Sequence, residues 1–312
     1  MTFAHVFLAV CVVQVASAQS LKSFPASVTV HVIDEEGVPV ENADASVTFT
    51  NFDIVKTRLT YTARRALTNN EGKVTATAEA LDNRVFYGAE KAGYYKTTGL
   101  QYEFKEKKEG RWQPWNPTVE VVLKRLVNPI PMYAKRVNLA MPVFGKPIGF
   151  DLGVGDWVVP QGKGISTDII FTATLEQRSE LDFDYNLTVS FPNELDGIQT
   201  FAAEPANRGS VLRSPRVAPE NGYEKQVVRT RTRRPGHAEQ ANDDPKRAYF
   251  FRTRTVVDEK GKILSANYGK IYGDFMAFTY YLNPTHNDRN VEFDPKKNMF
   301  TAVWGSELVS DP

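Results

Sequence analysis

Cysteine is almost absent from the sequence, since the 312 residues contain only Cys11. Cys11 lies in an N-terminal apolar run that we expect to be removed, so the rest of the chain offers no thiol for a disulfide, a nucleophile or a metal site. Runs of 18 apolar residues are also missing, and we therefore expect no membrane-spanning helix. Neither sign of charge is in excess, because 38 Lys and Arg face 37 Asp and Glu. This balance argues against a nucleic-acid-binding protein.

What is present is an ordinary globular composition, 42% apolar and 24% charged, of a length that suits one large domain or two. Residues 3–15 are apolar apart from His5 and Gln14. Ala16-Ser17-Ala18 follows, with small residues where a signal peptidase requires them. The sequence therefore predicts a signal peptide over residues 1–18 and a secreted, periplasmic or cell-surface protein.

Alternation with a period of two residues is the dominant pattern of the remaining chain. Val28, Val30 and Val32 form one face of such a segment, and Val119 and Val121 form another. This pattern places one face of a strand on a core, and short glycine-containing turns separate the segments. We predict an all-β protein with two β-sandwich domains, over residues 24–126 and 132–312, joined by a Pro-containing linker at 127–131.

The first part carries a recognisable set of turn motifs. Its first strand ends at Asp34-Glu-Glu-Gly37, Asn69-Asn-Glu-Gly72 precedes a later strand, and Gly93-Tyr94 comes near the end. Gly37 and Gly72 suit the positive φ of hairpin turns. Over about residues 24–125 the pattern resembles the carboxypeptidase regulatory-like domain, a transthyretin-like (Ig-like) β-sandwich. The resemblance implies a non-catalytic module of exported proteins; related hydrolases carry a Tyr-Arg-Gly-Ser segment and catalytic histidines that this chain lacks.

The second part matches no family that we can name. Six glycines within residues 145–164 indicate a long irregular loop interrupted by short strands, and residues 235–245 indicate a surface loop. The length and the spacing of the apolar residues favour a second, larger β-sandwich. Its expected strands cover residues 169–174, 183–189, 227–233, 249–257, 263–268 and 275–282.

The sequence carries no recognisable catalytic motif. His31, His237 and His286 are far apart, and no Gly-x-Ser-x-Gly nucleophile motif occurs. Pairs of carboxylates are available in any chain with 37 acidic residues, so they do not by themselves indicate a glycosidase. We predict that the protein is not an enzyme and has no cofactor.

Metal binding has one superficial signal. Asp182, Asp184 and Asn186 have the spacing that opens a calcium loop, but Leu187 stands where such a loop needs glycine. The alternating apolar residues of this segment predict a strand instead, and we predict no metal site there. A calcium site built from loop carboxylates such as Asp151 and Asp156 stays open as an alternative.

Two tryptophans lie in a proline-rich polar segment, Arg111-Trp112-Gln113-Pro114-Trp115-Asn116-Pro117. Trp112 and Trp115 could present flat apolar faces to sugar rings, with the amides as hydrogen-bonding groups. The structural alternative is that both rings fold over the edge of the domain and pack against the linker.

Arginines recur in two similar strands. Arg229, Arg231 and Arg233 share one face of the first, and Arg252 and Arg254 share one face of the second. We predict that residues 234–247 join them as a hairpin, which would create a basic ladder. Such a ladder needs compensation because like charges opposite each other destabilise a sheet. The compensation could be an external acidic polysaccharide or phosphate, or an internal acidic row formed by Glu180, Asp182 and Asp184.

The preferred function is a non-catalytic extracellular or envelope module that binds or scaffolds, with the first domain as connector and the second as the carrier of any ligand specificity. The main alternative is carbohydrate binding through Trp112, Trp115, Arg229, Arg231, Arg252 and Arg254. A polysaccharide or peptide hydrolase, or an accessory protein to one, is a second alternative. The expected partners are a polysaccharide or another envelope protein and no nucleic acid; the oligomeric state stays open.

Overall fold

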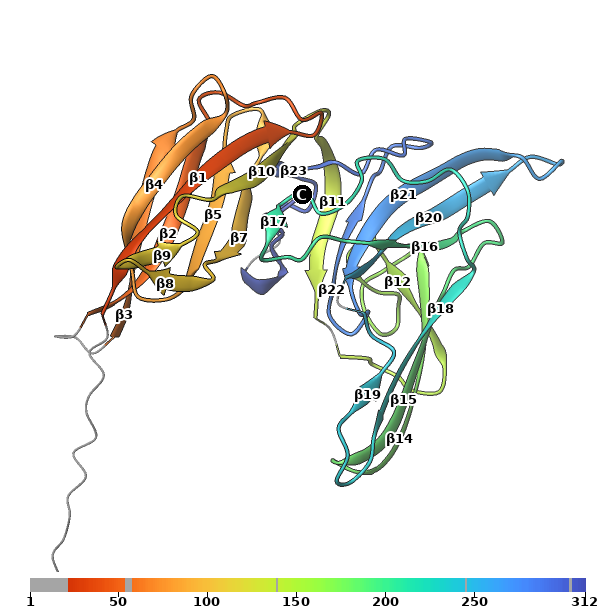
Figure 1. Ribbon diagram of the computed structural model, residues 1–312. Helices are drawn as coiled ribbons and strands as arrows, with labels where there is room; N and C mark the ends of the chain where they lie inside the picture. The colour runs from red at the N-terminus through yellow and green to blue at the C-terminus, as the bar shows by residue number, and fades with distance from the viewer. Residues whose placement is uncertain (1–21, 54–57, 139, 245, 303–304) are drawn as a thin grey trace, which may run out of the picture.

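The computed structural model describes residues 22–53, 58–138, 140–244, 246–302 and 305–312, and the predicted signal peptide lies outside these ranges. Two β-sandwiches follow each other along the chain (Figure 1), which confirms the predicted fold class. Among the described residues, the helical structure is limited to the short 3-10 turn η1 (Gly305–Glu307), and no helix is long and apolar enough to cross a membrane.

The first sandwich packs a four-stranded sheet, in the order β4-β1-β10-β6, against a five-stranded sheet, in the order β17-β7-β5-β2-β3. In the first sheet, β1 pairs antiparallel with β4 and parallel with β10. The valines predicted to face the core, Val28 and Val121 among them, are buried. The strands that residues 24–125 contribute are β1 (Phe24–Asp34), β2 (Asp44–Asp53), β3 (Arg58–Leu67), β4 (Lys73–Ala80), β5 (Arg84–Glu90), β6 (Tyr94–Tyr95), β7 (Thr97–Glu103), β8 (Glu106–Lys108), β9 (Arg111–Gln113) and β10 (Thr118–Arg125).

The glycine motifs of the first part form the turns that the sequence predicts. Gly37 has φ +80° and Gly72 has φ +70°. The buried Asp34 carboxylate accepts the backbone N–H groups of Glu36 and Val38 at 3.1 and 2.9 Å. A Cβ at Gly72 would lie 2.4 Å from the carbonyl oxygen of Val32, so this turn has no room for a side chain.

The second sandwich packs two six-stranded sheets, in the orders β16-β20-β21-β22-β11-β23 and β13-β12-β14-β15-β18-β19. Each expected strand corresponds to an observed one, although β22 begins three residues later than predicted. The elements are β11 (Ile130–Val137), β12 (Pro147–Asp151), β13 (Asp156–Trp157), β14 (Ile169–Ser179), β15 (Asp182–Ser190), β16 (Gly197–Ala202), β17 (Gly209–Ser210), β18 (Gln226–Arg233), β19 (Gln240–Ala241), β20 (Arg247–Val257), β21 (Ile263–Gly273), β22 (Phe278–Leu282) and β23 (Phe293–Asn298).

The boundary between the two parts differs from the prediction in two respects. Ile130 and Pro131, expected in the linker, begin β11 and so belong to the second sandwich. The short strand β17 comes from the second part of the chain but pairs with β7 at the edge of a sheet of the first sandwich. The chain thus crosses between the sandwiches again well after residue 131.

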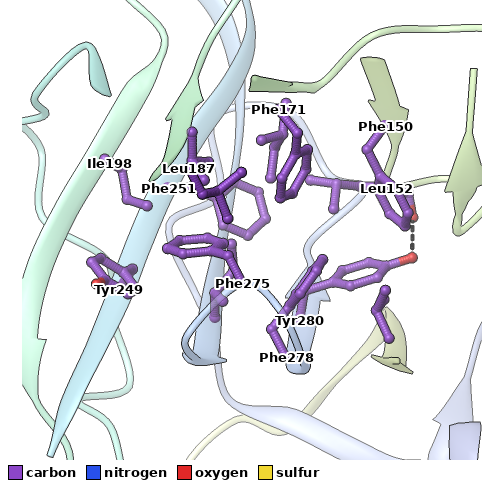
Figure 2. Close-up of a cluster of buried hydrophobic side chains, with 14 of the residues drawn as sticks. Phe150, Leu152, Phe171, Leu187, Ile198, Tyr249, Phe251, Phe275, Phe278 and Tyr280 are labelled. Atoms are coloured by element: carbon purple, nitrogen blue, oxygen red, sulfur yellow. Dashed lines mark hydrogen bonds between the residues drawn. The ribbon is translucent and has the colours of Figure 1, made fainter. Parts of the chain in front are cut away.

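The core of the second sandwich is dominated by aromatic rings (Figure 2). Phe150 contacts Tyr280 edge to face, with ring centroids 6.2 Å apart, and Phe275 lies against Tyr249 at 5.0 Å. The Tyr280 hydroxyl donates a hydrogen bond of 2.7 Å to the carbonyl oxygen of Leu152, the dashed line in Figure 2. Interlocked rings of this kind resist rearrangement, and they fix the strands that carry the arginines.

Candidate functional site

Trp112 is a core residue of the first sandwich. It lies on β9 with 7% of its surface exposed, and its indole N–H donates to the carbonyl oxygen of Ala80 at 3.0 Å. Its ring stacks on Phe104 and lies under the Lys107 ammonium at 4.5 Å. The prediction that Trp112 presents a face to a sugar is therefore wrong, because the ring's apolar surface is used in folding.

Trp115 keeps a partly accessible ring. It lies between β9 and β10, is 38% exposed, and has the Arg111 guanidinium 4.9 Å above its ring. The next residue, Asn116, has φ +53° and accepts hydrogen bonds from Thr29 at 2.9 Å and Ser27 at 3.2 Å through its side-chain oxygen. The structure thus separates the two tryptophans, and ligand binding at Trp115 alone stays a prediction.

The two arginine rows lie on strands that are not neighbours. Strand β18, with Arg229 and Arg231, pairs with β15 and β19, whereas β20, with Arg252 and Arg254, pairs with β16 and β21. The strands belong to different sheets, so the predicted basic ladder is wrong. The reason is β19, which forms within the connecting loop, folds back onto β18 and occupies the edge that β20 would need.

The predicted internal acidic partners face away from the arginine row. Arg231 stands opposite Tyr185 in the register of β15 and β18, and Asp184 stands opposite Thr232. Directly opposed residues share a face of the sheet and successive residues alternate, so the carboxylate and the guanidinium lie on opposite faces.

Asp184 is instead paired with other arginines. Its carboxylate binds Arg234 at 2.8 Å and Arg178 at 2.6 Å, and these two partners, Arg234 foremost, lower its pKa to about 2. Arg231 binds Glu239 at 2.6 Å at the surface. Each of these charges has a partner within the protein.

The arginines of β20 bind neighbouring loops through hydrogen bonds and an ion pair. Arg252 is buried and donates from Nε to the carbonyl oxygen of Leu195 at 2.7 Å. Arg254, with φ +57°, makes a two-point ion pair with the buried Asp168 at 2.7 and 2.8 Å. Both guanidiniums therefore hold the fold, and the structure does not bring them together with Arg229 and Arg231.

The two loop carboxylates considered for calcium accept backbone amides. Asp151 accepts four N–H groups, including those of Gly153 and Ile165 at 2.9 and 3.0 Å. Asp156 accepts those of Trp157 and Lys163. Among the described residues, no group of three or more potential ligating side chains comes together.

The junction between the sandwiches is a second candidate site, which the sequence reasoning missed. Gly209 and Ser210 of β17 pair antiparallel with Thr98 and Thr97 of β7. The N–H of Val211 continues the ladder to the carbonyl oxygen of Lys96 at 2.9 Å. A segment of the second part thereby completes a sheet of the first.

Glycine makes this approach feasible. Gly99 has φ +70°, and a Cβ there would lie 2.2 Å from the carbonyl oxygen of Asn207 in the crossing segment. Any other residue would both strain the backbone and push that segment away.

Ion pairs flank the added strand. The Lys124 ammonium binds the Glu204 carboxylate at 2.7 Å and also donates to the carbonyl oxygen of Leu212 at 2.9 Å. Arg216 grips Glu35 through two hydrogen bonds of 2.9 and 2.6 Å, and these bonds lower the pKa of the Glu35 carboxyl. Both pairs join residues from different sandwiches.

The centre of the junction is the carboxylate of Glu292, which is 1% exposed. It accepts the Tyr95 hydroxyl at 2.9 Å and the backbone N–H groups of Val127 and Asn128 at 2.9 and 2.8 Å. Burial raises the pKa of Tyr95 far above its usual value, with the hydrogen bond to Glu292 as the second cause. Glu292 thus joins the connector to both sandwiches. No motif in the sequence around Glu292 distinguishes it from a glutamate at the protein surface.

No family model matches the chain, and no curated protein matches it. Among solved structures, the shaft pilin SpaA of Lactobacillus rhamnosus GG is 13% identical, with 58% of this chain and 91% of that chain covered and a TM-score of 0.23. The major pilin subunit BcpA of Bacillus cereus is 12% identical, with 86% and 97% covered and a TM-score of 0.24. At such TM-scores the whole chains do not superpose, and the role of a pilin does not transfer to this protein.

Proposed function

We propose that the protein is an exported, non-catalytic binding or scaffolding module of the extracellular space or cell envelope, in which two β-sandwiches act as one stiff unit. The observation that carries the proposal is the junction: β17 completes a sheet of the other sandwich, and the buried Glu292 ties the connector down. Domains joined by a plain linker move relative to each other by default. A protein that only had to tether two ligands would not need this junction.

The chemistry of the junction supports stiffness. A buried carboxylate loses its hydration, and it is stable there only when hydrogen bonds replace that hydration. Glu292 has three such donors, from Tyr95, Val127 and Asn128. Opening the junction would expose or orphan all of these groups at once, so small rotations between the sandwiches are resisted.

Within this unit we propose that the first sandwich is a carboxypeptidase regulatory-like domain and acts as the connector. The motifs behind the resemblance are turn motifs, and Gly37 and Gly72 have the positive φ that such turns require. Any ligand specificity then lies in the second sandwich, with its longer loops and larger sheets.

The experiment that tests the proposed function follows the native protein in the organism that makes it. Cell fractionation locates the protein, and mass spectrometry identifies its mature N-terminus. Chemical cross-linking of intact cells identifies its neighbours. We expect a mature chain that begins at Gln19, outside the cytoplasm, cross-linked to envelope components.

Two outcomes would contradict the proposal. One is a cytoplasmic protein that retains residues 1–18. The other is turnover of a polysaccharide or peptide by the purified protein that disappears when a single carboxylate is replaced by its amide.

A further inference from the structure

The second sandwich contains a cavity of about 370 Å³ that none of the features above explains. It lies between the Arg229 region of β18, the start of β20 and the turn that connects β21 with β22. Its walls carry three guanidiniums and three carboxylates, and the small residues Gly273 and Ala277 complete the lining. The lining residues are Arg213, Arg229, Asp243, Asp244, Arg247, Gly273, Asp274 and Ala277.

Arg229 is the unusual group in this cavity. Only 4% of its surface is exposed, and its Nε and Nη1 atoms have no hydrogen-bond acceptor among the described residues. Its guanidinium lies 5.4 Å from the ring centroid of Tyr249, which supports the cation from one side only. Burial lowers the pKa of Arg229, because the buried guanidinium loses its hydration. The missing acceptors do not replace that hydration, so the buried charge lowers the free energy of unfolding.

The remaining charges are held in place but do not neutralise Arg229. Arg213 donates from Nε to the carbonyl oxygen of Glu204 at 2.7 Å, and its guanidinium lies 4.4 Å from the Tyr272 ring. The Asp274 carboxylate accepts two backbone N–H groups of its own turn through one oxygen. In the described part of the chain, no ion pair within 4 Å joins any of the lining arginines to a lining aspartate.

We infer that this cavity binds a hydroxyl-rich ligand that carries one carboxylate, as an acidic sugar residue does. The carboxylate would meet the Arg229 guanidinium from the cavity side, with Arg213 and Arg247 adding positive charge, since hydrogen bonds between a guanidinium and a carboxylate are charge-assisted and strong. The ligand's hydroxyls would donate to Asp243, Asp244 and Asp274, which can accept but not donate. Such a site adds ligand binding that the scaffolding role does not require.

The balance of charges favours a carboxylate over other ions. A phosphate dianion would gain from the arginines but would be repelled by three nearby carboxylates. A metal cation would have to approach the buried Arg229 charge, and the aspartates do not converge on a metal-binding geometry. A monoanion surrounded by hydroxyl donors satisfies both kinds of group at once.

The test measures binding of D-glucuronate to the full mature protein by calorimetry, with D-glucose and inorganic phosphate as comparison ligands. Arg229→Met removes the charge and keeps the contact with Tyr249. This variant is expected to fold, since Arg229 has no ion pair to lose. Arg231→Met is the matched control, because it removes an arginine two residues away on the same face that is already paired with Glu239.

We expect saturable glucuronate binding at millimolar concentration or below, at least tenfold weaker binding of glucose and phosphate, and loss of binding in Arg229→Met but not in Arg231→Met. Three results would overturn the inference: no saturable binding of glucuronate, phosphate binding as strong as glucuronate binding, or equal losses in the two variants. None of these results bears on export or on cross-linking to the envelope, so the inference and the proposed function fail separately.

Discussion

The junction and the β18 side of the second sandwich both bury charged side chains, but they treat them differently. At the junction, Glu292 accepts three hydrogen bonds and Arg216 grips Glu35 at two points. On the β18 side, two atoms of the Arg229 guanidinium have no acceptor. A third buried charge, Lys270, is 0% exposed and donates one hydrogen bond of 3.0 Å, to Ser214.

The number of hydrogen-bond partners thus distinguishes buried charges that stabilise the fold from buried charges that destabilise it. A buried charge with a full set of partners destabilises strongly when one partner is removed. A buried charge with few partners is a cost that apolar replacement relieves. The comparison therefore predicts opposite signs for substitutions that look alike in sequence, and the following experiments test those signs.

The largest effect is expected at the junction. Glu292→Ala leaves the Tyr95 hydroxyl and two backbone N–H groups without an acceptor and should lower the free energy of unfolding by about 3–5 kcal/mol. Glu292→Gln keeps one acceptor oxygen and should cost less. Chemical denaturation of both variants measures the order. Equal free energies of unfolding for Glu292→Ala and the unchanged protein would show that Glu292 does not stabilise the junction.

The opposite sign is expected for Lys270. Its ammonium lies among Tyr rings, 4.8 Å from the centroid of Tyr281, and burial lowers the pKa of Lys270 to about 7 from its ordinary 10.5. Lys270→Met should raise stability by about 1–4 kcal/mol at neutral pH, because it removes a charge that loses its hydration on folding.

The pH dependence supplies a second check on Lys270. The unfolded chain holds the proton up to pH 10.5, whereas the folded chain releases it from about pH 7. Stability should therefore rise with pH between these values, by at most about 1.4 kcal/mol per pH unit, and the penalty should be constant below this window. The difference in unfolding free energy between Lys270→Met and the unchanged protein should shrink from pH 7 to pH 9. A difference that does not change with pH would contradict the assignment.

A smaller effect is expected where β17 joins the first sandwich. Gly99→Ala meets both a positive φ and the carbonyl oxygen of Asn207, and should cost about 1–3 kcal/mol. Gly93→Ala is the matched control, because Gly93 has φ +84° and open space around it. Hydrogen exchange should become faster at Val211, whose N–H donates to the carbonyl oxygen of Lys96, in Gly99→Ala only. Equal exchange in both variants would mean that the close approach at Gly99 does not hold β17.

The smallest effect is expected at a paired surface charge. Arg231→Met breaks an ion pair with Glu239 that is partly exposed, and should change stability by less than about 1 kcal/mol. Raising the salt concentration should reduce even this difference, since exposed pairs are screened. A loss comparable to that of Glu292→Ala would erase the distinction between the junction and the surface.

Local pattern was sufficient for the strands and for many of the turns. Alternation placed the valines of β1 on the core, and the glycines of the two turn motifs adopt the positive φ that was expected. These features depend on neighbours within a few residues, so one sequence contains what is needed to predict them. The pattern also predicted correctly that the 145–164 loop is interrupted by short strands.

The local sequence pattern did not predict which strands pair with each other. The two arginine strands share the run Arg-Thr-Arg-Thr, which made a hairpin between them a reasonable prediction, yet β19 pairs with β18 and β20 lies in the other sheet. For Trp112 the sequence left both sugar binding and packing open, and the structure places the ring on β9 in the core. Neither outcome follows from local composition, because each depends on which other segment of the chain these residues contact.

By itself, the sequence determined the class of fold, the positions of most strands and the conformation of the glycine turns, since backbone sterics and the two-residue period act locally. Only the tertiary structure decided which charges are paired. Glu292, Lys270 and Arg229 are ordinary charged residues in the sequence. Their buried environments come from other segments of the chain: Tyr95 binds Glu292, Ser214 binds Lys270, and Tyr249, on the other sheet of the sandwich, lies against Arg229. Desolvation and hydrogen bonding depend on that assembly, and they decide whether a charge joins two domains, burdens a core or is left available to a ligand.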